Sequence, residues 1–247
     1  MLEQLQNYYA AQGILATAFS CRHSAICSAS SPKFTGPKSA YVSTGYESGE
    51  LPRLLFLSLD SGSAEADPLD RMPVAVRRQE ELDRAIWTLP KNRHWFRTHE
   101  LAWYILKKVK AELQLDNAKH YFAHANSAKC CMNNDHNSKA SAVLFKNCLK
   151  FLSGELAILR PDLIVTQGQE AKNAMSTLVE RTAPAIDRFT VVGDLNGTHV
   201  FWLHTYHPNN YKLFNPQRAF NKGTQVAEGF ERYATAMQEF IDARKYA

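Results

Sequence analysis

Two short apolar runs, each ending in a polar turn, constrain the fold of this chain most strongly. The run "RLLFLSL" at residues 53–59 leads into "DSGS", and "DLIVTQG" at 162–168 ends in a glycine turn. Continuous apolar runs of this length, bounded by turn residues, are typical of strands buried on both faces. Strands of this kind occur in parallel sheets covered by helices. The two runs therefore predict an α/β fold with a mainly parallel sheet.

Segments with helical spacing separate the predicted strands. We expect helices over residues 2–12, 97–113, 141–160, 169–180 and 223–245. We expect further strands at 120–126, 188–193 and 198–208. This alternation predicts a three-layer α/β/α sandwich, formed by one domain over residues 1–247. A charged, proline-containing segment at about 63–93 is expected to be an irregular or partly helical insertion.

Composition supports a globular domain and limits its surroundings. The chain has 247 residues, of which 45% are hydrophobic and 21% charged, and its net charge of +5 is compatible with a nucleic-acid partner without establishing one. It has no apolar stretch long enough to span a membrane, and its first residues lack the pattern of a signal peptide. We therefore expect a cytoplasmic protein with no membrane contact. In that reducing compartment, cysteines are expected as ligands or core residues rather than disulfides.

Three polar residues lie at predicted strand ends: Asp60, Asn126 and His207. Polar side chains at the carboxyl ends of parallel strands are where a site of an α/β protein assembles. An acid, an amide and an imidazole there are suited to reading a base and to hydrolysis. Each residue also has an ordinary structural explanation. Asp60 would be a helix cap or turn residue, Asn126 a turn former and His207 a surface histidine.

The cysteines form a second candidate site. Cys21 and Cys27 lie in "CRHSAIC", Cys130 and Cys131 follow a predicted strand, and Cys148 lies on the next helix. Four thiolates from two regions of the chain suit a 4Fe–4S cluster or a tetrahedral zinc ion. Only one of the adjacent pair is expected to be a ligand, because neighbouring side chains diverge. Alternatively, Cys148 is a core thiol and the others are incidental.

Taken together, these segments resemble the uracil-DNA glycosylase superfamily, and most closely its iron–sulfur family 4. The family's "GExPG" turn corresponds to "SLDSG" at 58–62, and its "TNxVKC" segment to "ANSAKC" at 125–130. Its "PxxIVxxG" segment corresponds to "PDLIVTQG" at 161–168, and its "HPxYLLRNP" loop to "HPNNYKLFNP" at 207–216. The resemblance therefore covers most of the chain.

The chain also departs from the family pattern. Leu59 stands where family 4 has its glutamate, and Asp60 stands where the family-1 "GQDPY" turn has its catalytic aspartate. The N-terminal cysteine pair has five intervening residues rather than two. An insertion separates the turn from the aromatic residue that stacks on the base, and the nearest counterparts are Trp95 and Phe96.

The resemblance implies a monofunctional DNA glycosylase, a hydrolase of N-glycosyl bonds. Asp60 would activate water and stabilise the cationic sugar, and His207 would donate a hydrogen bond to the departing base, whose edge Asn126 would read. The cluster ligands would be Cys21, Cys27, Cys130 and Cys148, with zinc as the alternative. The loop after His207 would contact DNA through Tyr211, Lys212, Leu213, Phe214 and Arg218.

The identity of the excised base stays open at this point. Uracil is the family default, whereas the altered turn and the insertion favour a larger pyrimidine, such as the glucosylated hydroxymethylcytosine of phage DNA that one branch of the superfamily attacks in antiviral defence. Two other classes of function are also open. One is a non-catalytic DNA-binding module that retains the fold. The other is an enzyme of free nucleotides, with "TQGQEA" at 166–171 holding a phosphate at a helix start. For a glycosylase we expect a monomer.

Overall fold

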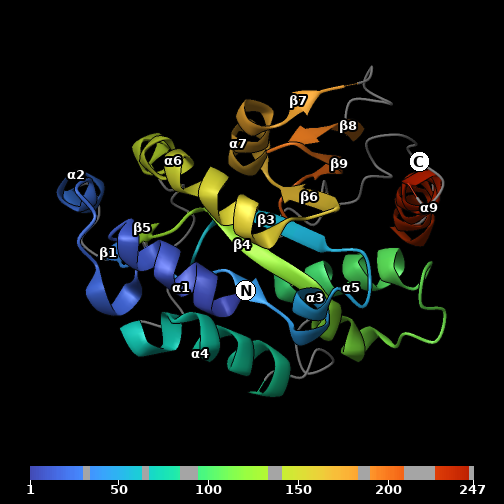
Figure 1. The fold of residues 1–247 in the computed structure, drawn as a ribbon, viewed down its shortest axis with the longest axis horizontal. Coiled ribbons are helices and arrows are strands. Elements are labelled where there is room, and N and C mark those ends of the chain that lie inside the picture. Colours follow the sequence, from blue (N-terminus) through green and yellow to red (C-terminus); the bar gives the residue numbers. More distant parts are fainter. Residues whose placement is uncertain are drawn as a thin grey trace.

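The apolar runs that precede the turns at Asp60 and Gly168 form neighbouring strands at the centre of a seven-stranded sheet. These strands are β3 (Leu54–Asp60) and β6 (Leu163–Gln167). The computed structural model describes residues 1–29, 34–62, 67–83, 94–132, 141–182, 190–208 and 226–244. Figure 1 shows the sheet running through the middle of the molecule, in the order β2-β4-β3-β6-β9-β8-β7. The other five strands are β2 (Tyr41–Val42), β4 (Phe122–Ala128), β7 (Glu180–Arg181), β8 (Thr190–Leu195) and β9 (Thr198–Thr205).

The four central strands of the sheet, β4, β3, β6 and β9, are parallel, and the strands at its two edges are antiparallel. Ser58 of β3 is opposite Asn126 of β4, and Val165 of β6 is opposite Leu203 of β9. The carboxyl ends of the four parallel strands therefore meet at one edge of the sheet. This confirms the predicted α/β fold with a mainly parallel central sheet.

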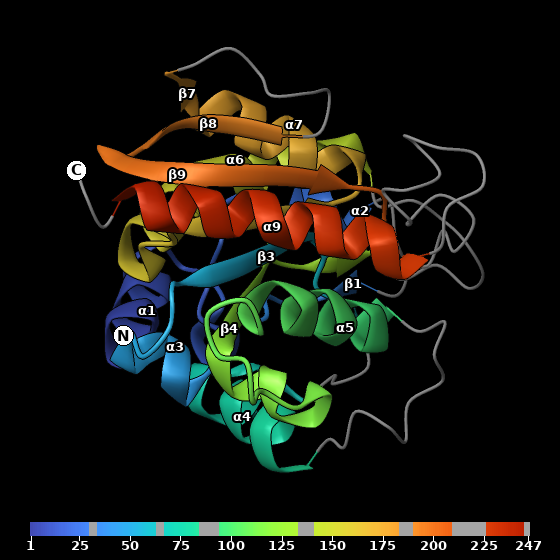
Figure 2. The same cartoon turned by 90° about the vertical axis from the view of Figure 1, so that its right-hand side faces the viewer.

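Helices cover both faces of the sheet, as the three-layer prediction requires. Along β3, Leu55 and Leu57 point into one core and Leu54 and Phe56 into the other, because successive side chains of a strand point to opposite faces. The first core contains α1 (Leu2–Ala11), α6 (Ala142–Leu159) and α7 (Gln169–Leu178). The second contains α5 (His94–Leu106) and α9 (Val226–Arg244), which lie in front of the sheet in Figure 2.

Helix α6 has clear start and stop signals. The Ser141 side chain accepts a hydrogen bond from the Val143 N–H, which satisfies one of the donors that a helix start leaves unpaired. The helix ends at Leu159, because Arg160 has a left-handed backbone with φ 48° and Pro161 follows. These signals fix the position of Cys148 on the buried face of the helix.

Some boundaries differ from the sequence predictions. Helix α5 ends at Leu106 rather than 113, because the chain turns back so that Leu113 enters the core and its carbonyl accepts a hydrogen bond from Trp103 Nε1 at 2.7 Å. The described part of the insertion is helical, in a 3-10 helix η2 (Pro68–Arg71), α4 (Pro73–Arg78) and a π-helical turn η3 (Gln79–Asp83).

Several short elements were not predicted. They include the edge strands β2 and β7, helix α2 (Ser24–Ala29), helix α3 (Thr44–Ser48), and a separate two-stranded ribbon of β1 (Phe34–Thr35) and β5 (Cys131–Met132). No helix in the part of the chain that the structure describes is long and apolar enough to cross a membrane.

Candidate active site and cysteine-lined cavity

The structure brings Asp60, Asn126 and His207 together at the carboxyl edge of the parallel strands. Asp60 is the last residue of β3, and Asn126 lies on the adjacent strand β4, where its Nδ2 donates a hydrogen bond to the Asp60 backbone oxygen at 2.8 Å. His207 follows the end of β9 by two residues. Burial lowers the pKa of His207, and the nearby Asp60 carboxylate partly opposes this effect. The imidazole is therefore neutral at pH 7 and lies within electrostatic reach of Asp60.

Several side chains hold the turn that carries Asp60. Ser127 Oγ donates to the backbone oxygens of Ser58 at 2.8 Å and Leu59 at 3.0 Å. The guanidinium of Arg71, which is buried, donates to Ser61 Oγ at 2.7 Å and to the Gly62 carbonyl at 3.3 Å. The segment after the turn thus supplies a cation that holds the turn in place.

The turn after β6 lies against the same group. Gly168 has φ +102°, a backbone conformation that residues with a side chain rarely adopt. A Cβ atom at this position would lie 3.0 Å from Leu59 Cδ2 and 3.5 Å from His207 Cβ. Gly168 therefore allows the ends of β3 and β9 to approach each other across β6.

A buried polar network lies next to Asp60 and Asn126, at the residues two positions earlier on the same strands, Ser58 on β3 and His124 on β4. Its centre is Ser58, whose Oγ lies 2.8 Å from His124 Nε2, 3.2 Å from His94 Nε2 and 2.7 Å from Gln167 Oε1. The His94 ring also lies 5.1 Å, centre to centre, from the His207 ring. The alternation along β4, in which Phe122, His124 and Asn126 share a face, could have identified His124 from sequence. The start of α5 gave no comparable signal for His94.

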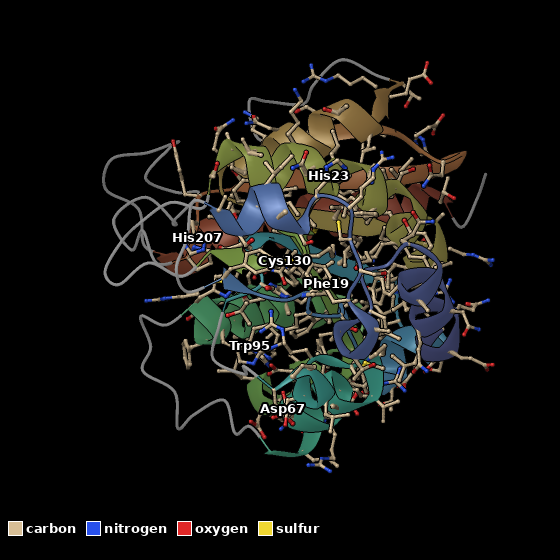
Figure 3. The ribbon with its side chains drawn as sticks, turned by 90° about the vertical axis from the view of Figure 1, so that its left-hand side faces the viewer. Phe19, His23, Asp67, Trp95, Cys130 and His207 are labelled. Atoms are coloured by element: carbon tan, nitrogen blue, oxygen red, sulfur yellow. The ribbon has the colours of Figure 1, made fainter. Side chains whose placement is uncertain are left out.

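The two aromatic residues predicted to stack on a base are packed into the protein. The Trp95 ring, whose position Figure 3 labels, lies 5.2 Å from His124, 4.8 Å from His99 and 5.9 Å from Phe122. It therefore extends the aromatic core towards the network. Phe96 is buried. Trp95 is thus the one of the pair that contacts the polar network, and a stacking role stays a prediction for both.

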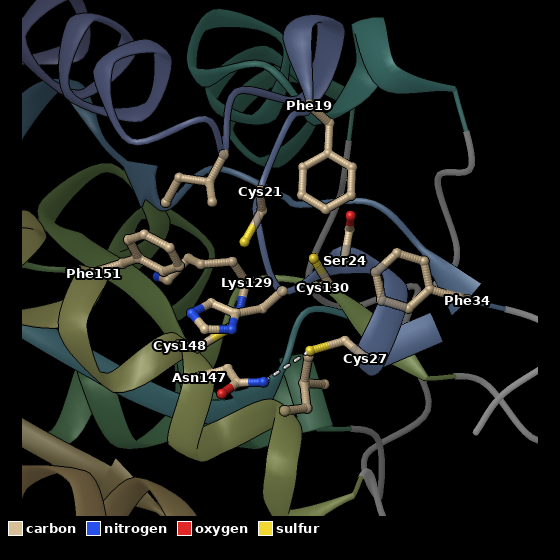
Figure 4. A pocket seen from close by; sticks show the side chains of 13 residues that line it. Phe19, Cys21, Ser24, Cys27, Phe34, Lys129, Cys130, Asn147, Cys148 and Phe151 are labelled. Carbon is tan, nitrogen blue, oxygen red and sulfur yellow. Dashed lines mark hydrogen bonds between the residues drawn. The ribbon is translucent and has the colours of Figure 1, made fainter. Parts of the chain in front are cut away.

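The four predicted cluster cysteines line one cavity on the opposite face of the sheet (Figure 4). Cys21 and Cys27 come from the N-terminal segment, Cys130 from the residues after β4, and Cys148 from α6. The space inside it that the centre of a water-sized sphere can reach is about 10 Å³. Apolar side chains complete the lining, among them Ile14, Phe19, Phe34, Leu144 and Phe151.

Hydrogen-bond donors reach two of the sulfurs in this cavity. The Lys129 backbone N–H donates to Cys148 Sγ at 3.4 Å, and Asn147 Nδ2 donates to Cys27 Sγ at 3.4 Å (Figure 4). Burial raises the pKa of Cys130, and the three other thiols of the cavity add to this effect. The two N–H donors act in the opposite direction, because a hydrogen bond to sulfur stabilises its anionic, ligating form.

Cys131 points away from the cavity. Its Sγ donates a hydrogen bond to Asp60 Oδ2 at 3.2 Å, and burial together with the Asp60 charge raises its pKa to about 12. All five cysteines are free thiols. Within the described ranges, no three or more His, Cys, Asp or Glu side chains are grouped closely enough to hold a single metal ion.

A buried ion pair lies beside the cavity. The Lys129 ammonium pairs with Glu155 of α6, and both side chains are almost completely inaccessible to solvent. The Tyr9 hydroxyl donates to the same carboxylate and accepts a hydrogen bond from the Ala40 N–H at 3.1 Å. One buried polar group therefore joins three segments: helix α1 through Tyr9, the residue after β4 through Lys129, and α6 through Glu155.

Buried histidines make the fold sensitive to acid. Burial lowers the pKa of His94 to about 3 and that of His204 on β9 to about 4, and also lowers the pKa of His124. In the unfolded chain these groups titrate near 6.5, so below that pH the unfolded state binds more protons.

We therefore expect the free energy of unfolding to be insensitive to these histidines above about pH 6.5. It should decrease as the pH falls from there towards about 4. His204 alone contributes about 1.4 kcal/mol per pH unit in this window. Urea unfolding at pH 7, 6 and 5 measures the slope, and His204→Gln should make it shallower. A slope that His204→Gln leaves unchanged would contradict the assignment.

The predicted DNA-contacting residues Tyr211, Lys212, Leu213, Phe214 and Arg218 lie outside the described residues. Comparison with protein families gives one match: the sequence profile of the uracil DNA glycosylase superfamily covers residues 47–227. This range includes Asp60, Asn126 and His207. A search of curated proteins gives no match to the chain.

Proposed function

This chain belongs to the uracil DNA glycosylase superfamily, a family of DNA glycosylases, and we propose that it is itself a monofunctional DNA glycosylase. The observation that carries the proposal is the convergence of a carboxylate, an amide and an imidazole where the four parallel strands end. That edge is where open α/β sheets bind ligands. The three residues come from three strands, so their proximity is a product of the fold.

The proposed reaction begins with a base turned out of the DNA stack, since the glycosidic bond of a stacked base is not accessible. Breaking the C1′–N bond leaves a cationic sugar and an anionic base. The Asp60 carboxylate would stabilise the sugar and orient the attacking water. His207, neutral because it is buried, would donate a hydrogen bond to the base oxygen on which negative charge develops.

Asn126 would read the edge of the base. One of its amide hydrogens donates to the Asp60 backbone oxygen, which fixes the orientation of the amide. The remaining N–H and Oδ1 are the donor and acceptor that a pyrimidine edge would meet. Both uracil and a cytosine bearing a bulky group, such as glucosylated hydroxymethylcytosine, present suitable partners, so we propose a pyrimidine of either kind.

The sequence of the catalytic turn favours hydrolysis without strand cleavage. Residues 58–62 read "SLDSG" and contain no lysine that would form a Schiff base with the sugar. The expected product is therefore an abasic site in an intact strand.

The experiment is direct. Oligonucleotides containing uracil, hydroxymethylcytosine or glucosylated hydroxymethylcytosine are incubated with the protein, treated with alkali and examined for cleavage at the modified position. Release of one modified base, with cleavage only after alkali, supports the proposal. If every substrate stays intact while DNA is still bound, the chain is the non-catalytic DNA-binding module. If DNA binding is also absent, an enzyme of free nucleotides is favoured.

We also propose that the cysteine cavity holds a structural 4Fe–4S cluster. Four thiols line one cavity together with several apolar side chains, and N–H groups donate to two of the sulfurs. Zinc, the alternative, would be bound by the same thiols at a single point. In a cluster each thiolate would bind a different iron. A bound cluster would join the N-terminal segment to β4 and α6.

Replacing Cys148 by serine should abolish the cluster. The wild-type protein, purified without oxygen, is expected to absorb broadly near 400 nm with about four iron atoms per chain. Cys148→Ser should lose this absorbance and most of the iron. Cys131→Ser is the matched control, because Cys131 points away from the cavity, and it should keep both. A colourless wild-type protein that contains zinc would contradict the proposal.

A further inference from the structure

We propose that Cys131 is a positioning residue that fixes the Asp60 carboxylate for the reaction, a role that rests on the proposed function. Its thiol donates to Asp60 Oδ2 at 3.2 Å, and the residue is 1% exposed. It belongs to neither the cysteine cavity nor the set of residues that would touch a base.

The backbone around Cys131 explains why its thiol has a defined direction. Cys131 is in β5, where it is opposite Thr35 of β1 in an antiparallel pair. Cys130, the preceding residue, lines the cavity, whereas Cys131 is the first residue of β5 and does not line it. The dipeptide therefore presents one sulfur to the cavity and the other to Asp60.

Among the described residues, the hydrogen bonds that hold the turn go to its backbone and to Ser61, whereas the Cys131 thiol binds the Asp60 carboxylate itself. The Asn126 amide and the Ser127 hydroxyl bind backbone oxygens of residues 58–60, and the Arg71 guanidinium binds Ser61 and Gly62. These contacts place the turn but leave rotation about the side-chain bonds of Asp60. The thiol restrains one carboxylate oxygen, so that the other is directed to the attacking water and the sugar.

Removing the thiol should slow the chemical step without weakening DNA binding. Hydrogen bonds to charged groups have net values that correspond to about a tenfold to a hundredfold change in rate. We expect a loss of this size for Cys131→Ala in single-turnover base release at saturating enzyme. Cys131→Ser retains an O–H donor and should recover most of the rate.

A double-mutant cycle separates this role from simple packing. If Cys131 acts through the carboxylate, Cys131→Ala should slow the wild-type enzyme but have little further effect in an Asp60→Asn background. The absorbance near 400 nm is measured for each variant and should match the wild type, and the melting temperature should stay well above the assay temperature, so that every variant is folded during the assay.

Each result has a defined meaning. Wild-type rates for Cys131→Ala, or equal losses for the alanine and serine variants, overturn the positioning role and leave the proposed function intact. Full additivity with Asp60→Asn also overturns it. Absence of base release by the wild type on every substrate overturns the proposed function and, with it, the role of Cys131.

Discussion

Asp60→Asn is expected to slow base release by about 10²–10⁴-fold, the range over which a positioned acid or base contributes to catalysis. Asparagine has nearly the same shape as aspartate but no negative charge, so it can neither stabilise the cationic sugar nor accept a proton from water. DNA affinity should be retained, because the main-chain contacts of the turn are unchanged. Single-turnover kinetics on the preferred oligonucleotide measure the rate.

The matched control for this variant is Asp194→Asn. Asp194 lies on β8 with an exposed side chain that pairs with His199, so the substitution removes the same charge far along the sheet order from β3. It should leave the rate of base release unchanged. Equal rates for wild type and Asp60→Asn would show that another group supplies the catalytic charge.

Lys129→Met is expected to destabilise the protein by about 3–5 kcal/mol, because it leaves the buried Glu155 carboxylate without its cation. The methionine fills similar volume, so the loss reflects the unpaired charge rather than a cavity. The free energy of unfolding in urea gives the magnitude.

A second substitution tests the cause of that loss. Lys129→Met combined with Glu155→Leu removes both charges and should recover most of the stability. Lys110→Met, which breaks the exposed pair with Glu50, is the control and should change stability little. A double variant as unstable as Lys129→Met would show that packing of the lysine stem dominates.

The central part of the fold was predictable because the sequence of its strands fits neither an exposed strand nor a helix. The runs 53–59 and 162–168 are too apolar to be exposed, and each ends in a turn that a helix would not tolerate. The edge strands β2 and β7 are each only two residues long, too short to produce a periodic pattern. Their pairing follows from the tertiary fold rather than from local preference.

The candidate site was predictable where it follows from strand direction. Parallel strands that each end in a polar residue bring Asp60, Asn126 and His207 to one edge whatever the loop lengths. The contact between Cys131 and Asp60 was not predictable, because it depends on the register of β5 with β1. The approach of His94 to His207 was not predictable either, because the start of α5 at His94 has no local sequence signal.

The strand order has a consequence for how the chain is made. Strand β6 lies between β3 and β9, so the middle of the sheet pairs segments that are distant in sequence. Such non-local pairing is slow, and it begins only after the later strand has left the ribosome. During synthesis, the edge of β6 that pairs with β9 therefore stays unpaired until β9 has been made. We expect the nascent chain to depend on chaperones until residues near 205 emerge, and premature termination before β9 to yield aggregates rather than a partly active fragment.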